Sequence, residues 1–258
     1  MENYGVPSHC RRTLSRMNVE SALALASRIV TGGSIETALA SEDADVRALA
    51  QRMTQTADII RRRETADVAP RRTAVRALVE AALTEDPLLR RYLAGIVMSA
   101  TEENDNAQWL ALVSRLTPAH IVWHYRLYQS VVSFVRDEPD EPGNWRGMMS
   151  RAFDALDALF TVALDEATIG SADVILNYNL LEHLLHEDLV RIDMDHLNFE
   201  DEVHFAMTTR GIAFFAAAVG IASGELDDLC LAHPNDLRLS PVHNLLAIRR
   251  LPREQDPV

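Results

Sequence analysis

Residues 173–222 read DVILNYNLLEHLLHEDLVRIDMDHLNFEDEVHFAMTTRGIAFFAAAVGIA, and the spacing of their hydrophobic residues changes along the segment. Leucines recur at helical intervals over 173–188, and residues 189–194 then alternate apolar and polar, as in a half-buried strand. A polar stretch precedes a second alternating run, 203–207, and Thr208 or Thr209 then caps an apolar helix that extends to about Ala222. The order helix, strand, polar tip, strand, helix predicts a winged-helix-like unit with one β-hairpin.

The rest of the chain has mostly helical periodicity. Asn18 precedes one expected helix and Gly32-Gly33 ends it, and Asp86-Pro87 and Thr117-Pro118 each combine a cap with a first-turn proline. The acidic, proline-rich segment 137–143 cannot continue a helix, and an amphipathic helix is predicted over 145–165 after it. We therefore expect a mainly α fold, a helical bundle with a C-terminal winged-helix-like unit carrying one β-hairpin.

Five regions follow from this pattern, and the helix predicted over 117–135 is expected to pack beneath the winged-helix-like unit. They are an N-terminal helical region (1–70), a helical core (71–136), a linker plus amphipathic helix (137–172), the winged-helix-like unit (173–223) and a C-terminal tail (224–258). The side chains expected to be largely buried in the core of that unit are Leu180, Leu184, Ile192, Phe205, Phe214 and Phe215.

Length and composition exclude several classes of protein. The chain has 258 residues, enough for one or two domains, and its only cysteines, Cys10 and Cys230, form no CxxC pair. The longest apolar run, Gly211–Ala222, is 12 residues long and too short to span a bilayer. Residues 1–16 contain no apolar segment typical of a signal peptide. A cytoplasmic protein without a membrane span is therefore expected.

The charge distribution is uneven, although the net charge is −13. All 25 basic residues are arginines; residues 1–80 have a net charge of +2 and residues 81–258 a net charge of −15. The most basic window is 47–76, with a net charge of +5. The residues in it that could contact nucleic acid or a partner protein are Arg61, Arg62, Arg63, Arg71, Arg72 and Arg76.

Direct DNA recognition by the winged-helix-like unit is disfavoured, because phosphate contacts supply most of the affinity of DNA-binding proteins. The expected recognition helix, 173–188, has no arginine. The hairpin has only Arg191 against a group of acidic residues. The basic window is interpreted first as a solvated helix face.

Two histidine pairs lie at helical spacing. His183 and His186 share a helix face, where they could bind zinc with a third ligand such as His204 or His196. The spacing differs from HExxH, and we expect the pair to lie on a polar edge beside Glu182 and Glu187 instead. His120 and His124 are expected to have packing or surface roles. No nucleotide-binding or hydrolase signature occurs, so no catalytic residue and no cofactor are predicted.

Two parts of the chain resemble one family. RYLAGIVMSA (91–100), LVSRLTP (112–118) and the long helix after it, together with LLEHLLHEDLVRI (180–192) and MTTRGIAFFAAAVG (207–220), are similar to the bacterial abortive-infection Abi-alpha family. The resemblance covers about residues 73–220 and implies phage defence, with no catalytic residue to carry over. Glu187 or Asp188 stands where the family has a glycine before the first strand, and the segment 137–170 is longer than in the family.

Two main functional interpretations remain open. The first is a non-enzymatic bacterial defence protein that acts through protein partners and self-association, as a homo-oligomer and most simply a two-fold dimer. The second is a winged-helix DNA-binding regulator that uses the basic segment 47–76 for phosphate contacts. A metal-dependent hydrolase is a third hypothesis, which metal analysis of the purified protein would test.

Overall fold

The computed structural model describes residues 18–62, 70–101, 104–137, 160–163, 174–192, 202–222, 229 and 248–250. Its described part is mainly helical, as predicted. The helices are α1 (Val19–Thr31), α2 (Ile35–Leu39), α3 (Ala44–Arg61), α4 (Arg71–Leu83), α5 (Pro87–Ser99), α6 (Ala107–Val113), α7 (Pro118–Asp137), α10 (Val174–His186) and α11 (Thr209–Ala218).

Local sequence signals set the helix ends. Asn18 caps α1, with its side chain accepting the Ser21 N–H at 2.8 Å, and Gly32 ends the helix in the left-handed conformation, with φ 74°. Asp86 caps α5 by accepting the Leu89 N–H at 2.7 Å, and Pro87 follows at the first helical position. These ends match the predicted ones because caps and first-turn prolines act within a few residues.

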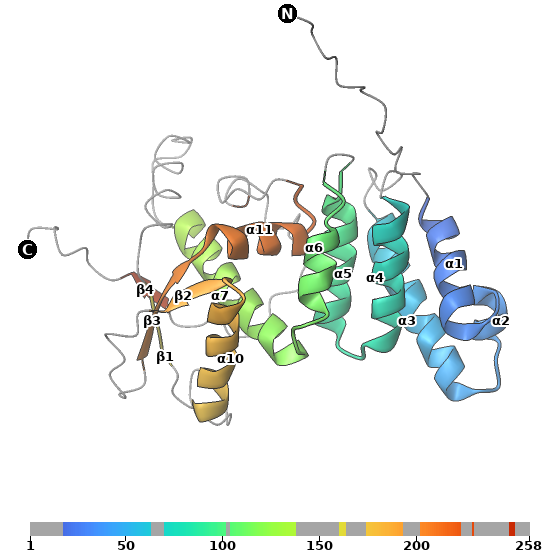
Figure 1. Ribbon diagram of the computed structural model, residues 1–258, viewed down its shortest axis with the longest axis horizontal. Helices are drawn as coiled ribbons and strands as arrows, with labels where there is room; N and C mark the ends of the chain where they lie inside the picture. Colours follow the sequence, from blue (N-terminus) through green and yellow to red (C-terminus); the bar gives the residue numbers. More distant parts are fainter. Residues whose placement is uncertain are drawn as a thin grey trace, which may run out of the picture.

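The helices α1, α4, α5 and α6 lie side by side, and α11 crosses beside α5 and α7 toward the end of the molecule that carries α10 and the sheet (Figure 1). One cluster of buried side chains extends from Val19 in α1 to Leu229. Its centre is α5, which packs against α3, α4, α7 and α11. A Cβ at Gly95 of α5 would lie 1.8 Å from the Ala218 carbonyl oxygen, so only glycine allows α5 and α11 to approach this closely.

The β-hairpin predicted near 189–207 is present, but it belongs to a larger sheet. β2 (Val190–Ile192) pairs with β3 (Glu202–Met207) in antiparallel register, with Val190 opposite Met207. β1 (Phe160–Ala163) pairs with β3, and β4 (Ile248–Arg250) pairs with β1, which gives the order β2-β3-β1-β4. The described sheet therefore has four strands, whereas the sequence predicted one two-stranded hairpin.

The additional strands correct two regional predictions. The amphipathic helix predicted over 145–165 is wrong at residues 160–163, which form β1, and its earlier part lies outside the described residues. The predicted C-terminal tail contains β4. Both strands are short and make their ladder bonds with distant residues, so tertiary pairing overrides the local helical spacing.

The predicted core of the α10–α11 region is confirmed where its side chains are described. α7 packs against both α10 and α11, as expected of the helix beneath the hairpin unit. The described members of the predicted core are 9% exposed or less; they are Leu180, Leu184, Phe205, Phe214 and Phe215. The side chain of Ile192 lies outside the described set.

Candidate functional site

Arg61, the first of the predicted contact arginines, joins two helices. Its guanidinium donates to Glu20 of α1 through Nε to Oε1 at 2.6 Å and through Nη2 to Oε2 at 2.9 Å, and it also pairs with Asp58 of its own helix. The hydrogen bond that Arg61 donates to Glu20 is the main cause that raises the pKa of Arg61. A phosphate would have to displace a bidentate carboxylate from this side chain. Arg61 therefore stabilises the contact between α1 and α3.

The other predicted arginines are distributed around the same pair of helices. Arg62 follows the end of α3 and is exposed, as are Arg71 and Arg72 at the start of α4, whereas Arg76 is half-buried one turn later. None of these four forms an ion pair within the described part of the chain. Arg63 lies outside the described residues. Of the predicted contact arginines that the structure describes, Arg62, Arg71 and Arg72 are thus the exposed ones without an ion pair.

His183 and His186 have different partners. The ring of His183 stacks on that of His120 in α7, with centroids 4.4 Å apart and planes tilted by 33°. His186 is exposed, with its Nε2 atom 3.8 Å from Oε1 of Glu182. Among the described residues, no group of three His, Cys, Asp or Glu side chains is placed to hold a metal ion. The structure thus places His186 on the expected polar edge, beside Glu182, and His183 in a contact between α7 and α10.

His124 is fully buried in a polar network that the sequence did not reveal. Its Nδ1 atom lies 3.0 Å from the Tyr92 hydroxyl, and its Nε2 atom lies 3.3 Å from the Gly211 carbonyl oxygen. The carbonyl can only accept, so Nε2 carries the proton and Nδ1 accepts from Tyr92. Burial lowers the pKa of His124 to about 3, and the ring is neutral near neutral pH. Its role is to hold α5, α7 and α11 together.

A second set of hydrogen bonds fixes the two residues that flank the hairpin, Leu189 and Thr208. Tyr128 of α7 donates its hydroxyl proton to the Leu189 carbonyl at 2.5 Å and accepts the Thr208 N–H at 3.2 Å. The Thr208 hydroxyl donates to the Asp188 carbonyl at 2.7 Å and accepts the Gly211 N–H at 2.9 Å, so Thr208 also caps α11. Both ends of the hairpin are thereby attached to α7.

Asp188 stands between α10 and β2 with φ 55°, in the left-handed conformation. The Leu189 N–H bonds back to the Leu184 carbonyl at 2.8 Å, which closes the end of the helix. Glycine is the usual residue in this conformation because its lack of a Cβ removes the steric cost. Asp188 therefore adopts a backbone geometry that a glycine would favour.

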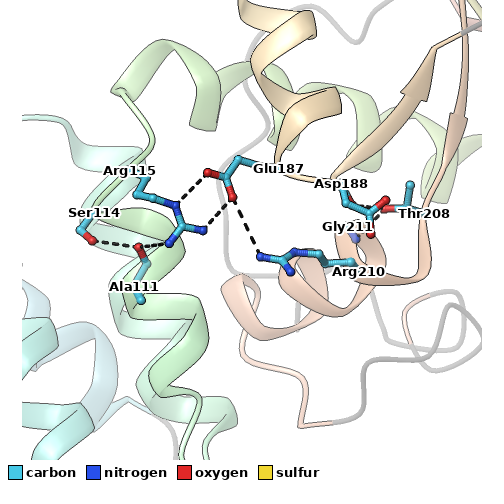
Figure 2. A network of polar contacts seen from close by, with 8 residues as sticks. All are labelled: Ala111, Ser114, Arg115, Glu187, Asp188, Thr208, Arg210 and Gly211. Atoms are coloured by element: carbon cyan, nitrogen blue, oxygen red, sulfur yellow. Dashed lines mark hydrogen bonds and ion pairs between the residues drawn. The ribbon is translucent and has the colours of Figure 1, made fainter.

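An ion-pair cluster lies beside this junction, and Figure 2 shows it between three elements. Arg115, between α6 and α7, donates to both carboxylate oxygens of Glu187, at 2.8 Å and 2.7 Å, and Arg210 of α11 approaches the same carboxylate at 4.0 Å. The hydrogen bond from Arg115 is the main cause that lowers the pKa of Glu187. The cluster connects the end of α10 to α11 and to the helices before α7.

Comparison of the chain with protein-family models, with curated proteins and with solved structures found no match. No described helix is both long enough and apolar enough to cross a membrane.

Proposed function

We propose that this chain is a non-enzymatic bacterial defence protein that acts through protein partners and self-association. The observation that carries the proposal is the Arg61–Glu20 pair. The pair engages Arg61 in the contact between α1 and α3. Three arginines remain exposed nearby, Arg62, Arg71 and Arg72, in a chain with a net charge of −13. Because phosphate contacts supply a large share of DNA affinity, so few exposed arginines in an acidic chain favour a protein partner over DNA.

The residues exposed on α4 also support a binding role. The exposed Arg71 and Arg72 at the start of α4 share that helix with Leu83, which is 65% exposed. Protein interfaces combine arginine with apolar side chains. The resemblance of residues 73–220 to the Abi-alpha family supports phage defence as the process.

Two charge-matched variants test the partner surface. R71E/R72E reverses the exposed pair at the start of α4, and R28E/R191E makes the same change in net charge at exposed positions elsewhere. Glutamate is favourable in the first turn of a helix, so R71E/R72E retains its fold, which circular dichroism would confirm. Cells producing the wild-type chain or R28E/R191E should show fewer phage plaques, and cells producing R71E/R72E should not. Equal protection by all three proteins would contradict the proposed surface.

Self-association has its own measurement. Light scattering over a range of concentrations should give a mass above the 28.8 kDa of the monomer, most simply twice that value. A monomer mass at every concentration would contradict the self-association part of the proposal and leave the partner part to the plaque assay.

The exposed Arg71 and Arg72 favour one alternative, a DNA-binding regulator. For that function, DNA affinity should fall steeply with salt, and loss of each phosphate contact should lower the slope by about one unit. We expect negligible DNA binding at physiological salt for the wild type and for R71E/R72E. Micromolar binding by the wild type that R71E/R72E removes would support the regulator instead.

A further inference from the structure

His120 of α7 and His183 of α10 stack on one another and connect the two helices. Their rings stack with centroids 4.4 Å apart, and His120 is 9% exposed. A tilted stack at this separation is suited to two neutral rings in contact. Two imidazolium ions at this distance would repel one another in a partly buried site.

The hydrogen bonds of His120 require its neutral form. Its Nδ1 atom accepts the Thr117 backbone N–H at 3.0 Å and lies 2.7 Å from the Thr117 hydroxyl. A backbone N–H can only donate, so Nδ1 carries no proton and the ring proton is on Nε2. Protonation of His120 would place a second donor against that N–H and break the bond at the start of α7. Burial is the main cause that lowers the pKa of His120, followed by the charge of His183.

His183 lies close enough to Glu187 for its charge to contribute to the lowered pKa of that carboxyl, but its buried Nε2 atom has no hydrogen-bond partner within the described part of the structure. Glu187, directly after α10, is held by Arg115 from the segment before α7 and approached by Arg210 of α11, while Glu182 of α10 faces His186. The Glu187 carboxylate thus already has two cationic partners.

We propose that the stack of His120 on His183 is a pH-sensitive lock, which holds α10 against α7 at neutral pH and releases it on acidification. The release is local to α10. The junction after it is fastened by Tyr128 and Thr208 through hydrogen bonds to main-chain carbonyls, which do not titrate. Proton uptake by His120 therefore loosens the helix while the hairpin stays attached.

Amide hydrogen exchange tests the lock, with each rate divided by its intrinsic rate at the same pH. Between about pH 7.5 and about pH 5, amides 180–186 of α10 should lose at least several-fold more protection than amides 92–97 of α5, because the release is local to α10. The α5 amides report any loss of global stability, which the buried His124 also causes. H183Q should abolish the excess loss in α10, and the matched variant H186Q, on the same helix, should retain it.

Equal loss of protection in α10 and α5 of the wild type would overturn the proposal, and so would an unchanged excess in H183Q. If H183Q does not fold, the wild-type chain still carries the test through the NMR shifts of its imidazole protons. His120 should then titrate below pH 6.5, the ordinary pKa of a histidine side chain. Titration of His120 at or above pH 6.5 would also overturn the proposal.

Discussion

The buried His124 makes stability depend on pH between about 3 and 6.5. Its pKa is about 3 in the folded chain and 6.5 when solvated, so the unfolded chain takes up a proton that the folded chain excludes. The contribution of His124 to the free energy of unfolding is fully present above about pH 6.5. It falls as the pH decreases and stops falling below about pH 3. The difference in proton binding predicts a loss of about 2 kcal/mol between pH 7.5 and pH 5, and about 4 kcal/mol by pH 3.

Urea unfolding of the wild type and H124Q at pH 7.5 and pH 5 measures this term. Glutamine can accept from Tyr92 and donate to the Gly211 carbonyl without titrating, so H124Q should be less stable at pH 7.5 but lose about 2 kcal/mol less on acidification. H186Q, which changes a 74% exposed imidazole, should follow the wild type. The assignment is refuted if wild type and H124Q lose the same free energy between the two pH values.

Five substitutions test the packing and the backbone conformation, each measured by urea unfolding at pH 7.5. F214A removes a fully buried ring and should cost about 3–5 kcal/mol, whereas L83A, at a 65% exposed position, should cost less than about 0.5 kcal/mol; equal costs would show that α11 is peripheral. G95A places a Cβ against the Ala218 carbonyl and should cost about 3 kcal/mol, and an unchanged midpoint would contradict the close approach of α5 to α11. D188G relieves the left-handed backbone and should stabilise by about 0.5–1 kcal/mol, while D188V should destabilise; the opposite order would contradict the φ of 55°.

Helix ends were predictable because their causes are local. Asn18, Asp86 and Thr208 each accept an N–H three residues later, and a few residues of sequence suffice to predict such a bond. The pairing of β2 with β3 was also predictable, since alternation at period two appears in both segments. These features required no knowledge of distant partners.

The strands β1 and β4 could not be predicted in the same way. Residues 160–163, FTVA, are too few to outweigh the helical spacing around them, and they become a strand by pairing with β3 and β4. The segment IRR at 248–250 has no alternation of its own. Its strand forms at the edge of a sheet that residues far away in the sequence provide.

The roles of the site residues depended on partners distant in sequence. Arg61 was a candidate contact because of its neighbours Arg62 and Arg63, but Glu20, 41 residues earlier, determines what it does. His183 was paired in the sequence with His186, three residues away, yet its ring meets His120 of another helix. In both cases the sequence identifies a charged or titratable side chain. The partner that determines its role lies on another helix and is brought near by helix packing. A surface function for this chain is therefore best sought at Arg62, Arg71 and Arg72, whose charges the described helices leave unpaired.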